Sequence, residues 1–305
     1  MRSIIIFLNR TCPVGCATCN VNASVDNTEF LDPEWIARFF INIDRFRSKQ
    51  YIVWTGGEPF LSFDSLKIGL KLAAAYGFKS EILSSGVWVQ QHPEFLRDLK
   101  KSGNYNLRLS LDAEHQKTVP WEYVRKTVRE SSKLGIELNF TLRHIPNEHE
   151  FTPEFYINRI KTEFPELYHL NRDNHRWIHV INTFGKDTQL SDINRKLKQR
   201  CYLGFKDVVV GFDGYVYPCC GLLGGPAKRC YRLGDALITG YDEIWHAIRK
   251  HPVLSLIRSK GPAAALSRFD ASFDHNTSVE HMEPCDICQI YIQHLKEFGF
   301  SERYS

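Results

Sequence analysis

Short apolar runs alternate with longer segments of helical periodicity over the first 184 residues of the chain. Each apolar run is bounded by turn residues, and runs of this length are typical of buried strands. The predicted strands are Ile4–Leu8, Tyr51–Trp54, Glu81–Ser84, Asn106–Leu111, Glu137–Leu142 and Trp177–Asn182. The predicted helices between them are Pro33–Arg47, Ser65–Tyr76, Pro93–Lys101, Trp121–Leu134 and Pro153–Phe164.

This repeated order of strand and helix predicts an α/β protein with a parallel sheet and right-handed crossovers. Six strand–helix units are fewer than the eight that close a barrel, so the expected fold is a partial, open (β/α)6 barrel. Ligands of such sheets bind at the carboxyl ends of the strands. Candidate functional residues are therefore sought directly after each predicted strand.

The pattern changes after Gly185. Two short alternating runs, 207–211 and 215–218, flank Asp213-Gly214 and predict a hairpin. A helix is expected near 241–250, and a stretch at 261–283 is interpreted as a surface loop or as a lid over the site. We expect residues 1–184 to form the barrel, 185–200 a linker, and 201–305 a second, smaller domain.

The composition of the 305 residues, 43% hydrophobic and 24% charged, is that of a globular protein, and the net charge of +4 is spread along the chain. No basic stripe is interleaved with aromatic residues, so we expect no nucleic-acid partner. No apolar stretch reaches the length of a membrane span, and no export signal precedes the first strand, so we expect a cytoplasmic protein without a membrane partner. Metal binding explains nine cysteines in such a protein better than disulfides do.

Three cysteines, Cys12, Cys16 and Cys19, follow the first predicted strand with the spacing C-x3-C-x2-C. Three thiolates on one short loop can bind three irons of a cubane iron–sulfur cluster and leave the fourth iron open. A structural zinc site would require a fourth ligand, and none lies nearby in the sequence.

This loop resembles the signature of the radical S-adenosylmethionine (SAM) superfamily. The resemblance implies that the three cysteines bind a 4Fe–4S cluster whose open iron chelates SAM. An electron from the cluster then cleaves SAM to a 5′-deoxyadenosyl radical, which abstracts a hydrogen atom from the substrate. One departure is Thr18, because the family usually has an aromatic residue directly before the third cysteine.

Further candidate residues follow the next four strands. Gly56, Gly57 and Glu58 resemble the family's "GGE" element, which implies binding of the SAM amino group.

Ser85 and Ser110 end strands three and four, and the resemblance implies that Ser110 lies near the SAM carboxylate. It also implies that Asp112 lies near the ribose, and Arg143 is a candidate partner for a carboxylate of SAM or substrate. Turn chemistry or solvation is the alternative for the serines, Asp112 and Arg143. His115 is interpreted as a capping or surface histidine rather than a cavity residue.

The other six cysteines lie after residue 200. Four of them, Cys201, Cys219, Cys285 and Cys288, suffice for an iron–sulfur cluster or for a zinc site. Their pattern resembles the shortened "twitch" version of the SPASM auxiliary-cluster domain, which implies an auxiliary 4Fe–4S cluster bound by these four. Cys220 and Cys230 remain, and they are either buried structural thiols or hydrogen-atom donors. Cys220 is the preferred donor because it directly follows a predicted cluster ligand.

The expected activity is hydrogen abstraction from a small polar metabolite, similar to a sugar or an aminocyclitol, in natural-product biosynthesis. Quenching of the substrate radical by Cys220 would give epimerisation, and oxidation through the auxiliary cluster would give a dehydrogenation. A peptide-modifying enzyme is the alternative, and a non-catalytic iron–sulfur or zinc-binding regulator is a remote one. The expected electron donor is a flavodoxin or ferredoxin.

Overall fold

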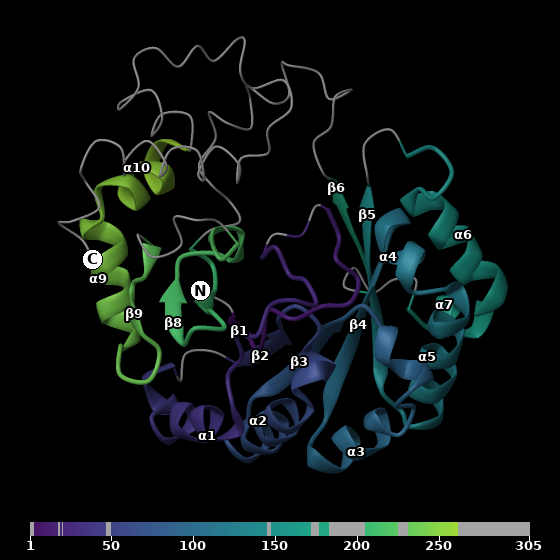
Figure 1. Ribbon diagram of the computed structural model, residues 1–305, viewed down its shortest axis with the longest axis horizontal. Helices are drawn as coiled ribbons and strands as arrows, with labels where there is room; N and C mark the ends of the chain where they lie inside the picture. Colours follow the sequence, from purple (N-terminus) through teal and green to yellow (C-terminus); the bar gives the residue numbers. More distant parts are fainter. Residues whose placement is uncertain are drawn as a thin grey trace, which may run out of the picture.

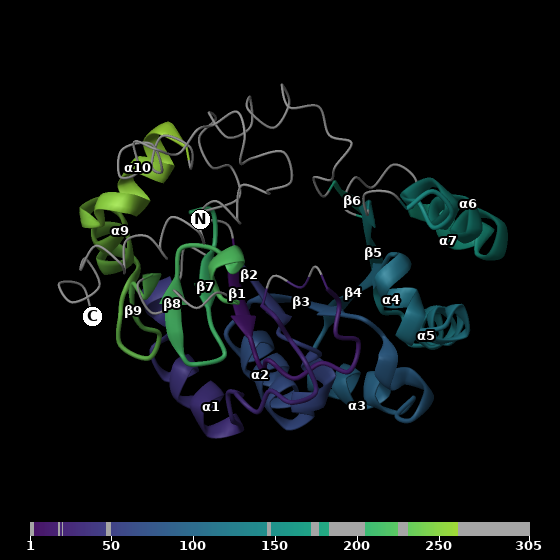
Figure 2. The same ribbon diagram turned by 45° about the horizontal axis from the view of Figure 1, so that its top comes forward.

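The computed structural model describes residues 3–17, 19, 21–46, 50–144, 148–171, 177–182, 205–224 and 231–261. Within these ranges nine strands form one sheet with the order β6-β5-β4-β3-β2-β1-β7-β8-β9. Helices cover one side of the sheet (Figure 1). In the turned view of Figure 2 the strands follow an arc, with α1, α2, α3 and α5 on its outer side.

The first six strands lie side by side in chain order and are all parallel. Their bounds are β1 Ser3–Phe7, β2 Tyr51–Thr55, β3 Lys79–Ser84, β4 Tyr105–Leu111, β5 Glu137–His144 and β6 Ile178–Asn182. All six predicted strands are confirmed, and each boundary agrees to within two residues. The sheet is open, as the six-unit count predicted.

The five predicted helices are confirmed, with shifted ends. They are α1 Pro33–Ile41, α2 Phe63–Ala75, α3 Phe95–Ser102, α5 Trp121–Lys133 and α6 Pro153–Glu163. The first prediction was too long, because α1 ends at Ile41 and a 3-10 turn, η1 Ile43–Phe46, follows it. Two short helices were not predicted, α4 Ala113–Thr118 and α7 Pro165–Asn171. The 3-10 turns η2 Pro59–Ser62 and η3 Val87–Gln90 follow β2 and β3.

Alternation along each strand separates two faces of the sheet. In β4 the residues Tyr105, Leu107, Leu109 and Leu111 are buried, and the residues between them are half-buried. The buried set packs against the helices. Helix α2 lies so close to the sheet that a Cβ added at Gly69 would be 2.5 Å from the ring of Trp54 on β2. The opposite face carries polar groups, including an ion pair of 2.9 Å between Arg108 and Glu81. The two faces thus separate a packed apolar layer from a polar interior.

The C-terminal segment continues the same sheet. Strand β7 (Val208–Val210) pairs with β1 in parallel, and β8 (Tyr215–Tyr217) and β9 (Gly234–Asp235) follow it in antiparallel register. The predicted hairpin and helix α9 (Tyr241–Lys250) are confirmed, and α10 (Pro252–Lys260) was not predicted. The linker at 185–200 and the stretch at 262–283 lie outside the described residues, and the division into two domains stays a prediction.

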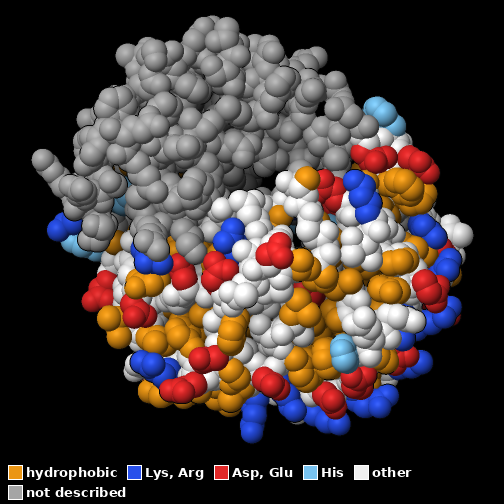
Figure 3. All heavy atoms as spheres, viewed as in Figure 1, with side chains coloured by type: hydrophobic (Ala, Val, Ile, Leu, Met, Phe, Trp, Pro, Cys, Tyr) orange, Lys and Arg blue, Asp and Glu red, His pale blue; other side chains and the backbone are white. Residues whose placement is uncertain are grey.

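The molecular surface carries acidic and basic side chains side by side over the helices (Figure 3). Large exposed apolar residues, such as Ile41 on α1 and Leu170 on α7, are spread over several elements. None of the described helices is both long enough and apolar enough to cross a membrane.

Candidate functional site

The cysteine loop is the segment 8–31 between β1 and α1. Its two ends run side by side, because Leu31 N–H donates to the Leu8 carbonyl at 2.7 Å and Arg10 N–H to the Glu29 carbonyl at 3.0 Å. A third bond of 3.1 Å joins Cys12 N–H to the Ser24 carbonyl. The base of the loop is thereby fixed at the carboxyl end of β1, where the sequence predicted a ligand site.

Polar hydrogens lie against the sulfur atoms of this loop. Ala23 N–H donates to the Cys19 sulfur at 3.4 Å. Burial raises the pKa of the Cys12 thiol to about 12. The backbone amides of Val14 and Gly15 donate to the Cys12 sulfur and have the opposite, smaller effect on its pKa. Amide donors of this kind stabilise a thiolate once iron has displaced the proton. The loop therefore fits a cluster held by sulfur ligands.

No three His, Cys, Asp or Glu side chains in the described part of the chain converge closely enough to hold one metal ion. Thr18, at the departure from the family pattern, lies outside the described residues.

The Gly56-Gly57-Glu58 turn packs directly on the base of the cysteine loop. Gly57 N–H donates to the Asn9 carbonyl and Glu58 N–H to the Thr11 carbonyl, both at 2.8 Å. A Cβ at Gly56 would lie 2.7 Å from the Asn9 carbonyl oxygen, and a Cβ at Gly57 would collide with that of Thr11. Glycine at both positions therefore lets the cysteine loop come close to this turn.

The Glu58 carboxylate is fully buried and lies against the end of β3. It accepts hydrogen bonds from the Ser84 hydroxyl at 2.8 Å, the Ser85 amide at 3.0 Å and the Ser85 hydroxyl at 2.5 Å. Burial nevertheless raises the pKa of Glu58 above its ordinary value. The structure thus brings together two predicted cofactor-binding residues, Glu58 and Ser85, and adds Ser84. Their contacts with SAM stay predictions.

Asp112 and His115 form the second polar group of the site. Asp112 caps α4 by accepting from the His115 amide at 2.9 Å, and its other oxygen lies 2.8 Å from His115 Nδ1. The ring of His115 lies within 3.8 Å of the Cys16 sulfur. Burial alone would lower the pKa of His115, but its contacts with Asp112 and Cys16 raise that pKa to about 10.

The sequence interpretation treated His115 as a capping or surface residue, and the structure places its side chain between Asp112 and Cys16 with 14% exposed. The spacing of three residues between Asp112 and His115, at the start of a helix, was the sequence signal for their contact. Arg143 lies close enough for its charge to lower the pKa of Asp112, and Ser110 is half-buried one pleat before the end of β4. The structure places these residues near the carboxyl ends of β4 and β5.

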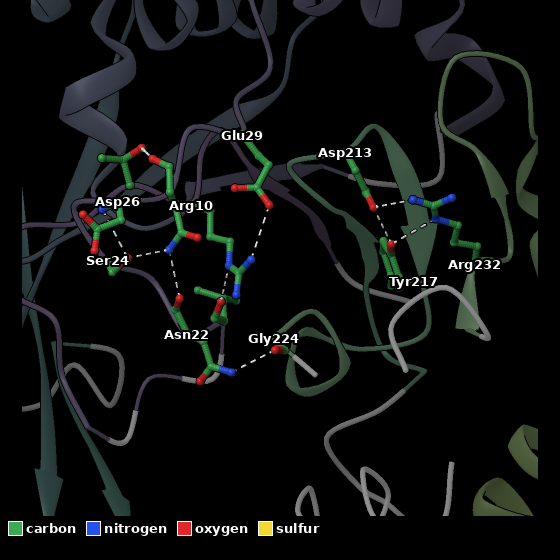
Figure 4. Close-up of polar contacts among 12 residues, drawn as sticks. Arg10, Asn22, Ser24, Asp26, Glu29, Asp213, Tyr217, Gly224 and Arg232 are labelled. Carbon is green, nitrogen blue, oxygen red and sulfur yellow. Dashed lines mark hydrogen bonds and ion pairs between the residues drawn. The ribbon is translucent and has the colours of Figure 1, made fainter. Parts of the chain in front are cut away.

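The remaining described cysteines lie on the turn after β8. Cys219 precedes the 3-10 turn η4 (Cys220–Leu222), and both thiols are half-buried. Gly224, just beyond η4, accepts a 2.8 Å hydrogen bond from the side chain of Asn22 on the cysteine loop (Figure 4). The predicted ligands Cys201, Cys285 and Cys288, together with Cys230, lie outside the described residues.

Fold, cysteine loop and family comparison agree. The chain matches the model of the radical SAM superfamily over residues 6–152 and that of the SPASM iron–sulfur cluster-binding domain over residues 201–289. The chain therefore contains a radical SAM domain, whose cofactors are a 4Fe–4S cluster and SAM, and a C-terminal SPASM-type domain, which binds auxiliary iron–sulfur clusters.

Relatives are similar at low sequence identity. The Bacillus subtilis (strain 168) protein YydG, named for peptide biosynthesis, is 23% identical over 234 residues, which cover 72% of this chain and 69% of YydG. The crystal structure of Streptococcus suis SuiB bound to SAM has a TM-score of 0.48 at 12% identity, covering 84% of this chain and 67% of SuiB. That of BtrN with SAM and 2-DOIA has a TM-score of 0.48 at 14% identity, covering 86% and 89%.

Proposed function

We propose that this enzyme epimerises a residue of a peptide substrate, with Cys220 as the hydrogen-atom donor. The peptide class was the alternative to a sugar-like metabolite in the sequence interpretation. The similarity to YydG, a protein named for peptide biosynthesis, now favours the peptide.

When bound, the cluster and SAM together supply a 5′-deoxyadenosyl radical that takes a hydrogen atom from a substrate carbon. Cys12, Cys16 and Cys19 hold the cluster in this proposal. Positions for SAM are assigned to Gly56, Gly57, Glu58, Ser85, Ser110, Asp112 and Arg143. These residues orient the cofactor and exclude water from the polar interior of the sheet.

Cys220 acts on the substrate after that abstraction. Its S–H bond breaks, one hydrogen atom passes to the substrate carbon from the opposite face, and a sulfur radical remains on Cys220. One electron and one proton then restore the thiol, and the electron comes from the auxiliary cluster or from a flavodoxin- or ferredoxin-type donor. A protein that carries such reduced thiols and clusters belongs in a reducing compartment, so we place it in the cytoplasm.

The observation that carries this proposal is the position of η4. Cys220 begins the turn, its carbonyl accepts from Leu223 N–H at 3.3 Å, and the next residue, Gly224, is hydrogen-bonded to Asn22. Asn22 lies three residues beyond the predicted cluster ligand Cys19. The turn that begins at Cys220, the proposed donor, is therefore joined to the cysteine loop four residues further on, at Gly224.

The test uses anaerobically reconstituted enzyme with dithionite, SAM and a set of synthetic linear peptides in deuterated water. We expect wild type to form 5′-deoxyadenosine and a peptide that has gained one deuterium at an inverted carbon. A Cys12/Cys16/Cys19→Ala triple variant should form neither product. Cys220→Ala should still form 5′-deoxyadenosine and should give no deuterated epimer.

Three results would contradict the proposal. Deuterated epimer from Cys220→Ala would exclude Cys220 as the donor. A peptide that has lost two hydrogens without gaining deuterium would show oxidation through the auxiliary cluster. Turnover of a sugar-like alcohol and of no peptide would return the substrate to the metabolite class.

A further inference from the structure

Two side chains of the cysteine loop reach across to the C-terminal hairpin. Asn22 Nδ2 donates to the Gly224 carbonyl at 2.8 Å, a contact between residues 202 positions apart in the sequence. The guanidinium of Arg10 lies over the Phe212 ring, 5.7 Å from its centroid. Arg10 is itself held by the Val21 carbonyl at 2.9 Å and by Glu29 at 3.3 Å (Figure 4). The loop therefore contacts both ends of the segment that carries Cys219 and Cys220.

The backbone of Asn22 is fixed in a specific conformation. Its φ of 48° lies in the left-handed region, which asparagine tolerates better than most residues. Asn22 N–H donates to the Cys19 carbonyl at 3.1 Å, and the Asn22 carbonyl accepts from Asn27 Nδ2 at 3.1 Å. The side chain thus projects from a closed turn that begins at the third cysteine of the signature.

Stability alone does not explain this contact. Asn22 is exposed, and a hydrogen bond between exposed groups adds little to the free energy of folding because water replaces either partner. The chain nevertheless has its left-handed asparagine at the position where the cysteine loop meets the end of η4. A contact that is weak for stability and specific in geometry fits a role in positioning.

We propose that Asn22 is a positioning residue that holds the Cys220 turn at a fixed distance from the radical-generating loop. This inference rests on the proposed function for its catalytic meaning. In the wild type, Cys220 meets the substrate radical before other hydrogen donors do. Without the Asn22 side chain the turn moves more freely, and more substrate radicals escape this transfer.

The test compares Asn22→Gly with Ser24→Ala in protein that holds its full iron content. Glycine keeps the left-handed backbone and removes only the side chain. Ser24→Ala is the matched control, since it also removes a polar side-chain group from this loop, but one that accepts only from Asp26 N–H at 3.3 Å and from Asn27 Nδ2 at 2.9 Å, both within the loop. The readouts are amide hydrogen exchange over residues 219–224 and the ratio of deuterated epimer to 5′-deoxyadenosine.

For Asn22→Gly we expect exchange over 219–224 to rise about twofold, the factor that corresponds to a weak, solvent-exposed hydrogen bond. We expect the epimer ratio to fall by a similar factor, with SAM affinity retained. Ser24→Ala should change neither. Asn22→Asp, which keeps the shape but cannot donate, should behave like Asn22→Gly.

Unchanged exchange in Asn22→Gly would overturn the inference, and this arm needs no substrate. A raised exchange with an unchanged epimer ratio would also overturn it, because the contact would then position nothing that matters to the reaction. Failure of the proposed function is a separate result: wild type would form no deuterated epimer from any peptide, whatever the exchange shows.

Discussion

Ser85 donates two hydrogen bonds to one carboxylate oxygen of Glu58, from its amide at 3.0 Å and from its hydroxyl at 2.5 Å. Both residues are buried, so water cannot replace either donor. This pair links the turn after β2 to the end of β3 at the base of the cysteine loop.

Replacing Ser85 with alanine removes the shorter of these two bonds. A buried carboxylate that loses a donor is left partly unsatisfied, and the expected cost is about 1–3 kcal/mol in the free energy of unfolding. The measurement is the urea midpoint under anaerobic conditions. Ser102→Ala is the control, because its half-buried hydroxyl donates at 3.4 Å to the Asp98 carbonyl within α3. Equal losses in both variants would show that the Glu58 contact has no special weight.

Glu58→Gln should change how stability depends on pH. Burial raises the pKa of Glu58 above 4.5, so the folded protein holds this proton more tightly than the unfolded chain does. The stability from this group is present in full below pH 4.5 and is lost as the pH rises through the raised folded pKa. The variant lacks this loss, so its stability relative to wild type should increase as the pH rises above 4.5. Urea unfolding at a series of pH values above 4.5 measures the difference.

The matched control is Glu163→Gln. Hydrogen bonds from Arg125 lower the pKa of Glu163 to about 2, and further bonds come from Trp121 and Arg159. Its stability contribution is lost only as the pH falls from 4.5 through that value. The free energy of unfolding that Glu163→Gln loses relative to wild type should therefore be constant from about pH 5 to about pH 8. Parallel pH profiles for the two variants would argue against a raised pKa at Glu58.

Gly57→Ala should disturb the cysteine loop. The added methyl group would meet the Thr11 carbonyl, a backbone atom that can yield only if the loop moves. We expect iron bound after reconstitution to fall by the share of one cluster, from about eight toward about four atoms per chain. Gly240→Ala is the control, because its methyl group would have an ordinary contact of 3.7 Å with Glu243. Full iron content in Gly57→Ala would contradict the clash.

Cys219→Ala and Cys220→Ala should separate the ligand from the donor. Cys219 is the predicted ligand, so its loss should lower the iron content attributable to the auxiliary cluster. Cys220→Ala should retain about eight irons, the number that two 4Fe–4S clusters require. Iron and sulfide analysis with electron paramagnetic resonance measures both. The reverse result would exchange the two roles and remove Cys220 from the proposed reaction.

Local patterns were enough to predict the six parallel strands, because each is a short apolar run between turn residues. The short helix α4 escaped prediction, since Ala113–Thr118 is polar and has no buried residue. Helix α10 begins after His251, whose ring accepts from Leu254 N–H at 3.3 Å, and histidine is not among the usual capping residues.

Contacts between distant segments were less accessible. Three cysteines at a fixed spacing predict a cluster, but nothing in the sequence around His115 predicts that its ring lies beside Cys16. The partner of Glu58 was equally hidden, because Ser85 comes 27 residues later. Such contacts depend on the register of neighbouring strands, which periodicity alone does not fix.

The pairing of β1 with β7 has a consequence for the order of events during synthesis. Strand β1 leaves the ribosome before β2 and β7, and β2 can cover one of its edges early. The other edge must wait for Val208–Val210, and the bond from Ser3 N–H to Asp207 spans 204 positions. Until then a nascent chain presents an apolar strand with an open edge, the kind of surface that recruits other chains. The segment that carries β7 therefore covers the free edge of β1 and protects it once that segment has been made.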